Sequence, residues 1–326
     1  MSAVLQAALQ FPGAHSALDP AGPQAGMAKG LWGPMYATAA VVFVLVMAAL
    51  LRGALRRRGA GEPPVDPAKE RRLRRVVTGA TALTAVILFA FLALDISVGR
   101  AVTATPGKDA LQLRVTGHQW WWEVQYRDSS PQRWVTTANE IHVPVGRPVA
   151  LELRSSDVIH SFWPPNLSGK RDLVPGNENS LWFQADSAGV YRAECAEYCG
   201  HQHAKMAMIV VAESPDSFAR WLVRQRDTAH TPADSLTRRG QEVFLSSSCV
   251  MCHSIAGTPA GSRVGPDLTH LAGRATIAAG TLPNTRGNLA GWIVDPQRIK
   301  PGAKMPPNQL DPDDLQALLA YLETLR

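Results

Sequence analysis

The stretch CAEYCGHQHAKM, residues 195–206 of this 326-residue chain, contains a set of metal-binding side chains that the fold must hold close together. Cys195 and Cys199 supply two thiols, His203 supplies an imidazole and Met206 supplies a thioether. Thiolate, thioether and imidazole are the ligands that select copper in its soft, redox-active states. A disulfide across so short a loop would strain the bond geometry, and zinc has little use for a thioether. The donor set therefore favours copper over these two alternatives.

A pair of coppers bridged by two thiolates needs a second imidazole. The segment DVIHSFWPP, residues 157–165, offers His160 in an apolar, aromatic setting. A lone histidine beside aromatic residues is more often part of a core than a ligand, so His160 is a candidate only in combination with the cysteine motif. A bridged pair would share one electron, so its bond lengths would change little and electron transfer would need little reorganisation.

A second redox motif lies further along the chain. CVMCH, residues 249–253, has the spacing of covalent c-type haem attachment, with Cys249 and Cys252 as anchors and His253 as the proximal iron ligand. Met305 is the only methionine after this motif and can fill the sixth iron position. A zinc knuckle built from two cysteines and one histidine is the alternative. All 4 cysteines of the chain fall into these two motifs, and this pairing indicates electron transfer.

Two apolar runs near the N-terminus, residues 31–51 and 76–94, contain no charged side chain. Each run is about 20 residues long, which is enough to cross the hydrocarbon core of a membrane. Residues 52–75 between them hold nine Lys and Arg against three Asp and Glu, an excess equal to the net charge of +6 of the whole chain. The positive charge therefore belongs to this loop and does not indicate a nucleic-acid partner. A transmembrane helical hairpin is predicted over residues 31–95, with a buried helix pair of a soluble protein as the alternative.

The positive-inside rule orients this hairpin, because the basic loop stays cytoplasmic. Both termini and the redox motifs would then lie on the periplasmic or outer side of a bacterial inner membrane, where haem c is attached. Residues 1–30 lack the basic and apolar regions of a signal peptide and are interpreted as an extended lead-in. The arginines on which the orientation depends are Arg56, Arg57, Arg58, Arg71, Arg72, Arg74 and Arg75.

Beyond the hairpin, residues 101–224 change to short alternating runs separated by turn residues, which predicts an antiparallel all-β sandwich or barrel. Residues 225–236 are interpreted as a linker. Residues 237–326 are predicted to form a separate domain that is helical at both ends, and Asp311 is expected to be the N-cap of its last helix. The predicted strands are 111–115, 120–126, 140–144, 149–155, 180–185, 190–195 and 205–211.

Four segments resemble cytochrome c oxidase subunit II in order and spacing. They are GHQWWW (117–122), SDVIHSFWPP (156–165), KRDLVPG (170–176) and the stretch CAEYCGHQHAKM. The resemblance covers residues 31–215 and implies a two-helix hairpin followed by a cupredoxin-like Greek-key domain. It also implies a dinuclear copper centre, CuA, with the side-chain ligands His160, Cys195, Cys199, His203 and Met206. The backbone carbonyl of Glu197 would be a further ligand, and its carboxylate could reach a hard cation such as Mg²⁺ at the contact with subunit I.

The same resemblance ranks neighbouring side chains. It implies that His203 and not His201 is a copper ligand, and that Met206 and not Met208 is one. Trp120 is similar in position to the tryptophan through which electrons reach CuA in this family. Packing in a core or at a membrane interface is an equal alternative for Trp120, because amphipathic tryptophan commonly serves both roles.

The last domain resembles class I cytochrome c, an all-α fold, through CVMCH and through GPDL at residues 265–268. This resemblance implies His253 and Met305 as the two axial iron ligands. His270 is a rival ligand and is interpreted as a loop residue. Contact between the first and last helices of the domain is expected through Gly240, Phe244, Leu318 and Tyr321.

Together the two resemblances imply the subunit that feeds electrons into a respiratory haem–copper oxidase. Electrons would pass from a cytochrome c or another donor through haem c and CuA to subunit I, which reduces oxygen and translocates protons. Subunit III would be a further partner, and Glu70 would match an acidic residue where protons are taken up. A CuA subunit of a nitric oxide reductase shares nearly all of these motifs and stays an alternative. So does a membrane-tethered copper or haem protein that delivers metal or senses redox state.

Overall fold

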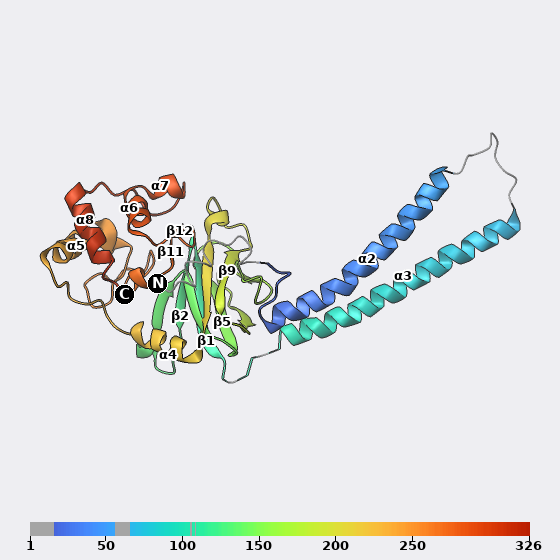
Figure 1. Cartoon of the computed structure of the whole chain (residues 1–326), viewed down its shortest axis with the longest axis horizontal. Helices are drawn as coiled ribbons and strands as arrows, with labels where there is room; N and C mark the ends of the chain where they lie inside the picture. The colour runs from blue at the N-terminus through green and yellow to red at the C-terminus, as the bar shows by residue number, and fades with distance from the viewer. Residues whose placement is uncertain (1–15, 56–65, 105, 108) are drawn as a thin grey trace. The chain divides into compact units, whose positions relative to one another are not determined.

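The computed structural model describes residues 16–55, 66–104, 106–107 and 109–326. The chain forms two compact units (Figure 1). One unit is the segment Gly26–Ala104, and the other comprises the residues before and after that segment. The smaller unit is helical, whereas the larger one contains all the described strands and the remaining helices.

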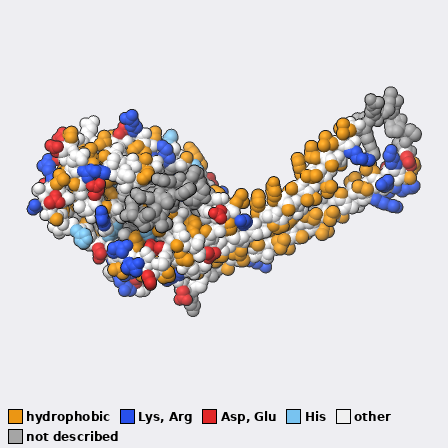
Figure 2. Space-filling view, viewed as in Figure 1, with side chains coloured by type: hydrophobic (Ala, Val, Ile, Leu, Met, Phe, Trp, Pro, Cys, Tyr) orange, Lys and Arg blue, Asp and Glu red, His pale blue; other side chains and the backbone are white. Residues whose placement is uncertain are grey.

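Two long helices, α2 (Pro23–Leu55) and α3 (Pro67–Val102), form the helical unit. By length and composition both can cross a membrane. Large apolar side chains such as Phe43 and Phe89 are 65% and 72% exposed, and hydrophobic side chains cover the visible surface of both helices (Figure 2). This exposure argues against the buried helix pair of a soluble protein, because soluble proteins rarely leave so large a continuous apolar surface in water.

The two helices extend beyond the apolar runs from which the spans were predicted. α2 already begins at Pro23, inside the expected lead-in, and α3 begins at Pro67 in the basic loop. The carboxylate of Asp66 accepts a hydrogen bond from the backbone nitrogen of Ala68 at 2.9 Å and caps α3. Polar loop residues therefore continue the helix by a few turns. Arg56, Arg57 and Arg58, which contribute to the predicted orientation, lie outside the described residues.

A β-sandwich of two five-stranded sheets follows the hairpin. The order of strands is β3-β2-β1-β5-β8 in one sheet and β4-β10-β9-β6-β7 in the other. Strands β1 and β5 are parallel, and so are strands β4 and β10. The large aromatic side chains of Trp122, Phe162 and Phe183 fill the core. The strands are β1 (Leu111–His118), β2 (Trp121–Tyr126), β3 (Val135–Ala138), β4 (Glu140–Pro144), β5 (Val149–Ser155), β6 (His160–Trp163), β7 (Arg171–Leu173), β8 (Asn179–Phe183), β9 (Gly189–Cys195) and β10 (Ala207–Glu213).

Both the predicted β-sandwich and its cupredoxin-like class are confirmed, although the prediction that its strands are all antiparallel is wrong for the pairs β1–β5 and β4–β10, and β3, β6 and β7 were not predicted as strands. They are the short strands, with three or four residues each, and Pro164 and Pro165 directly after β6 interrupt any alternating pattern between β6 and β7. One helix, α4 (Pro215–Arg224), lies inside the region expected to be all-β. Its Trp221 stacks on the His142 ring, with centroids 4.2 Å apart, so this helix closes one end of the sandwich.

The last domain is helical, as expected for a class I cytochrome c fold. Its first helix, α5, crosses its last helix, α8, at Gly240: a Cβ there would lie 2.0 Å from the backbone oxygen of Ala317. Phe244 and Tyr321 pack beside this crossing with ring centroids 6.4 Å apart. The expected contact between the two helices is therefore present. The domain contains α5 (Ser235–Ser246), α6 (Arg286–Val294), α7 (Pro296–Ile299), α8 (Pro312–Leu322) and the short strands β11 (Thr276–Ile277) and β12 (Leu282–Pro283).

Candidate copper and haem sites

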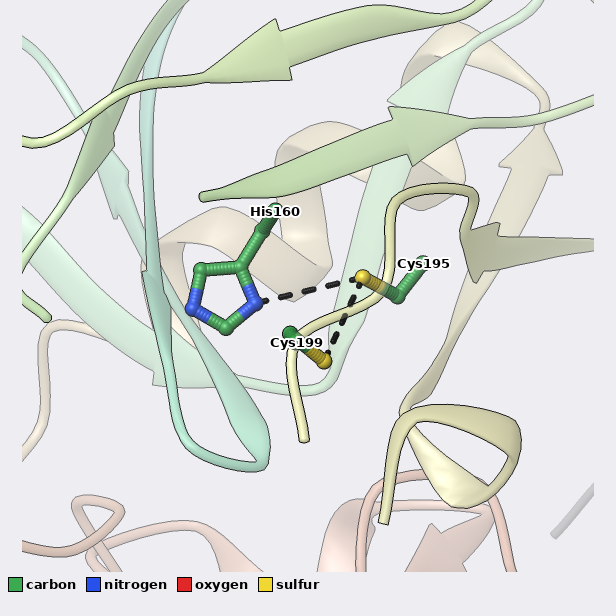
Figure 3. Close-up of side chains that lie close together, drawn as sticks. All are labelled: His160, Cys195 and Cys199. Atoms are coloured by element: carbon green, nitrogen blue, oxygen red, sulfur yellow. Dashed lines mark hydrogen bonds between the residues drawn. The ribbon is translucent and has the colours of Figure 1, made fainter. Parts of the chain in front are cut away.

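The donor side chains of the first site meet at one end of the β-sandwich. His160 is the first residue of β6 and Cys195 is the last residue of β9, and these strands are paired with Phe162 opposite Cys195. Cys199 follows in the loop that leads to β10. The side chains of His160, Cys195 and Cys199 point toward one another (Figure 3). Their ligand atoms all lie within 4.8 Å of one another, and all three residues are buried.

The two sulfur atoms lie at the centre of a larger donor set. Sγ of Cys195 is 3.7 Å from Sγ of Cys199 and 3.9 Å from Nδ1 of His160. Sγ of Cys199 is 3.7 Å from Nδ1 of His203 and 3.8 Å from Sδ of Met206. Each sulfur therefore has its own imidazole nearby, an arrangement that suits two bridging thiolates between two soft metal ions.

A backbone oxygen completes this set. Sγ of Cys195 lies 3.2 Å from the carbonyl oxygen of Glu197, whereas the Glu197 side chain is exposed. All the residues predicted for the copper site are thus brought together, including the carbonyl. His201 is exposed, and Met208 is buried as a core residue of β10.

Asp157 holds His160 in place. Its carboxylate lies 2.8 Å from Nε2 of His160 and accepts a hydrogen bond from the backbone nitrogen of Gln119 at 2.7 Å. Although burial raises its pKa, these hydrogen bonds lower the pKa of Asp157 well below its usual range. A carboxylate on the outer nitrogen of a histidine fixes its tautomer and ring orientation. Sequence reasoning missed Asp157, although its position three residues before His160 was a usable signal.

The two thiols ionise as a pair. The hydrogen bond with Cys199 lowers the pKa of Cys195 to about 3, and its neighbour Cys195 raises the pKa of Cys199. One negative charge in this pair therefore disfavours a second one. A cationic metal would remove that conflict, because a thiolate that binds a metal ion is stabilised in its deprotonated form.

The second site is a cavity of about 330 Å³, lined mainly by the last domain and on one side by the β-sandwich residues Gln119, Trp120, Trp121 and Asn139. Its lining includes Cys249, Cys252, His253 and Met305, so the residues predicted to attach and ligate a haem share one space. Nδ1 of His253 donates to the carbonyl oxygen of Pro266 at 2.7 Å, which leaves Nε2 as the nitrogen free to bind a metal. Burial lowers the pKa of His253 and so favours the neutral, ligating form.

Two buried polar groups in this lining fit the carboxylates of a haem. Arg274 and Thr276 both line the cavity, and within the described part of the chain Nε of Arg274 and Oγ1 of Thr276 have no hydrogen-bond partner. Buried polar groups normally have partners. A group that carries carboxylates would satisfy both atoms, so the residues present fit a haem. His270, the rival iron ligand, is buried with both ring nitrogens unpartnered among the described residues.

Trp120 contacts both sites. Its Nε1 donates to the carbonyl oxygen of Cys199 at 3.0 Å, and its side chain also lines the haem cavity. Gln119 donates to the same carbonyl at 2.8 Å. With 9% of its surface exposed, Trp120 is buried between the copper donors and the cavity, a position that core packing and electron transfer both allow.

Two families match this chain. Residues 111–213 match the family described as "Cytochrome C oxidase subunit II, periplasmic domain". Residues 237–326 match the family described as "Cytochrome c". The first match spans the β-sandwich with its copper donors, and the second spans the domain with the haem cavity.

Relatives of known name agree with these matches. The chain is 35% identical to cytochrome c oxidase subunit 2 of Alkalihalophilus pseudofirmus, over 95% of this chain and 91% of that protein. It is 33% identical to cytochrome c oxidase subunit 2 of Bacillus subtilis, over 67% of this chain and 63% of that protein. A crystal structure of the periplasmic domain of subunit II from Bradyrhizobium japonicum cytochrome oxidase is 28% identical, with a TM-score of 0.35. The matched region covers 37% of this chain and 97% of the crystallised domain.

Proposed function

Because this chain belongs to the cytochrome c oxidase subunit II family, we propose that it feeds electrons into a respiratory haem–copper oxidase through a haem c and a CuA centre. The oxygen-reducing site of such a complex would be on subunit I. The observation that carries the proposal is the position of Trp120, which contacts the copper donors on one side and lines the haem cavity on the other.

The copper pair would be held by the donors that meet at the end of the β-sandwich. Cys195 and Cys199 would help to hold the two ions through their sulfur atoms, and Asp157 would keep the His160 ring in its ligating orientation. When bound, the copper pair and the haem iron each take up and release one electron at a time. The full ligand set is His160, Cys195, the Glu197 carbonyl, Cys199, His203 and Met206.

The haem would be attached to Cys249 and Cys252, and His253 and Met305 would be the ligands of its iron. Ligation by histidine and methionine raises the reduction potential of an iron into the range of an electron carrier. The Pro266 carbonyl fixes which nitrogen of His253 faces the cavity. Arg274 and Thr276 would bind the carboxylates of the group.

We place the chain in a bacterial inner membrane, anchored by α2 and α3, with both redox domains on the outer side. Its partners would be subunit I, subunit III and a cytochrome c or other donor. The exposed carboxylate of Glu197 is available for a hard cation at the contact with subunit I. Glu70 lies in the first turn of α3, where it would face the side from which protons are taken up.

Gas consumption by the purified complex tests this proposal against its nearest alternative. We expect oxygen uptake driven by a reduced donor, and little consumption of nitric oxide. The names of the relatives favour the oxidase. Consumption of nitric oxide without oxygen uptake would establish the reductase instead. Extraction of the chain alone, with readily exchangeable copper, would support a metal-delivery or redox-sensing protein.

A further inference from the structure

Lys300 is a buried lysine at the contact between the β-sandwich and the haem domain, with 3% of its surface exposed. Its Nζ donates to the carbonyl oxygens of Trp120 at 3.1 Å, Lys205 at 2.8 Å and Ala278 at 3.2 Å. The first two carbonyls belong to the β-sandwich and the third belongs to the haem domain. One amino group therefore joins the two domains.

The three acceptors match the donor count of a charged lysine. An ammonium group has three N–H donors and no acceptor, and lysine is almost never fully buried unless it is paired. Burial and the neighbouring Lys205 lower the pKa of Lys300 to about 7, so they disfavour its charged form. The three carbonyl oxygens favour the charged form, because only an ammonium group has enough N–H groups to donate to all three.

A loop of the haem domain is shaped to present its carbonyls to the same contact. Residues 278–280, here named the docking turn, all have positive φ, with values of 53°, 57° and 72°. Two of them are alanines, and non-glycine residues adopt this conformation only where surrounding contacts hold it. Its three successive carbonyls accept from Lys300 Nζ, from the Ala207 backbone nitrogen at 3.0 Å and from Arg192 Nη1 at 3.3 Å.

Further hydrogen bonds flank Lys300 on the same contact. The carboxylate of Glu140 in β4 accepts from the backbone nitrogen of Ala275 at 3.0 Å. The side chain of Gln202 donates to the carbonyl oxygen of Pro301 at 2.6 Å. Lys300 thus lies within a set of hydrogen bonds that join the two domains. Among the bonds described, its amino group is the donor that reaches carbonyl oxygens of both domains.

The position of Lys300 connects this contact to the two redox sites. One of its acceptors, Lys205, directly precedes the copper-donor residue Met206. Another, Trp120, donates to the carbonyl of Cys199. Lys300 and Trp120 both line the haem cavity. A shift of Lys300 would therefore change the separation between the cavity and the copper donors.

We propose that Lys300 is a positioning residue that clasps the haem domain onto the β-sandwich and thereby fixes the distance between the two redox sites. This inference rests on the proposed function, since the distance affects a reaction only if electrons pass between the sites. Electron transfer between fixed sites slows steeply as their separation grows. The contact made by Lys300 would therefore govern the rate of the internal step without touching either cofactor's ligands.

Amide hydrogen exchange tests the clasp directly, in the full chain with both cofactors bound. Lys300→Met keeps an unbranched side chain that is one atom shorter and removes the donor that joins the domains. We expect exchange in residues 205–210 and 274–281 to rise at least about tenfold, because local opening exposes the amides of Ala207 and Ala275. Exchange in α8 should stay unchanged. Lys170→Met removes the same charge from an exposed position and should leave all these segments as they are. Unchanged exchange in the Lys300 variant would overturn the proposal.

A second variant opens the same contact from the other side, in case Lys300→Met does not fold. At Gly280 a Cβ would lie 3.0 Å from Cβ of Ala207, so Gly280→Val should push the docking turn away and raise exchange in the same segments. Gly146→Val is the matched control, because Gly146 has a φ of 76° with nothing within 4 Å of its Cβ position. Equal exchange in the Gly280 variant and in wild type would count against the clasp.

The internal electron-transfer rate, after photoreduction of the haem, is the second readout. In Lys300→Met we expect it to fall about tenfold or more, because small misplacements of reacting centres have large effects on rate. The rate should also become dependent on viscosity, while both cofactor spectra stay unchanged. An unchanged rate, or an altered copper spectrum, would overturn the positioning role. No transfer in the wild-type protein would instead overturn the proposed function, and the exchange experiment would still decide the clasp.

Discussion

Gly117 lies against the imidazole of His160 so closely that a Cβ at Gly117 would be 2.7 Å from Cδ2 of that ring. The haem domain repeats this relationship with Gly265, where a Cβ would lie 2.8 Å from Cε1 of His253. In both sites a glycine therefore forms the wall behind a candidate metal-binding histidine. Neither position has a positive φ, so the need for glycine comes from close approach and not from the backbone conformation.

This relationship predicts two reciprocal effects. Gly117→Ala should displace the His160 ring and change the copper spectrum while the haem spectrum stays as it is. Gly265→Ala should tilt His253 and change the haem spectrum while the copper spectrum stays as it is. Absorption and electron paramagnetic resonance spectra of the purified protein measure both. Gly169→Ala is the control, because nothing lies within 4 Å of its Cβ position. A Gly117 variant with an unperturbed copper spectrum would contradict the assignment of His160.

Cys199→Ser should abolish the mixed-valence copper signal and leave the haem spectrum intact. The sulfur of Cys199 is within 4 Å of the sulfurs or nitrogens of three other donors, and a hydroxyl is a poor ligand for copper in its soft states. Electron paramagnetic resonance at low temperature checks the outcome. The persistence of the same signal in this variant would rule out the proposed ligand set.

Met305→Ala should remove the sulfur-to-iron absorption band of the oxidised haem. Met305 lines the cavity with His253, but so does Met251, whose side chain is exposed. Met251→Leu is therefore the matched control and should keep the band. If the band survived in Met305→Ala and vanished in Met251→Leu, the sixth ligand would be the other methionine.

The buried His142 predicts a pH dependence of stability. Burial lowers its pKa, but hydrogen bonds that its ring nitrogens donate to the carboxylates of Glu140 at 2.8 Å and Glu213 at 2.7 Å raise the pKa of His142 overall. A raised pKa in the folded state stabilises the fold below the unfolded pKa of about 6.5, and this contribution is lost as the pH rises through the folded pKa. The lowered pKa of Glu213 acts oppositely, so its contribution is lost in acid.

His142→Gln should therefore destabilise the β-sandwich most near pH 6. Removing one partner of a buried ion pair costs about 3–5 kcal/mol, because it leaves the other partner without its counter-charge. Thermal unfolding at several pH values measures the difference between wild type and variant. That difference should shrink from pH 6 toward pH 9, and growth over the same range would refute the charged state of His142.

The local motifs of both sites could be predicted from the sequence because their donors lie close together along the chain. CAEYCGHQHAKM contains most of the proposed copper donors, from the end of β9 through the loop that follows, and CVMCH contains three of the proposed haem-binding residues. The strands β4 and β5 have the predicted bounds, since both combine a clear alternation with turn residues at each end. The helix α8 begins after Asp311 as predicted, although this side chain makes no capping hydrogen bond.

The contacts that hold the sites in place could not be predicted, because they join segments distant in sequence. Lys300 binds the carbonyl of Trp120, which is 180 positions away, and no local pattern marks a lysine that will be buried. Arg274 and Glu140 are charged residues in the interior of a contact between domains, whereas charged side chains are ordinarily expected at the surface. The helix α4 was missed although Ser214, whose hydroxyl accepts a hydrogen bond from the Ser217 backbone nitrogen, and Pro215 at the first helical position are both signals of a helix start.

The hydrogen-bonded contact between the docking turn and β10 also affects how the internal step should respond to the solution around it. A soluble donor must find its acceptor by diffusion, and its docking through surface charge weakens as salt is added. The proposed haem and copper sites share one covalent chain, so the effective concentration of one at the other would be set by geometry and not by dilution. The internal transfer should therefore follow first-order kinetics at any protein concentration and respond little to ionic strength, while the delivery of electrons from outside should depend on both.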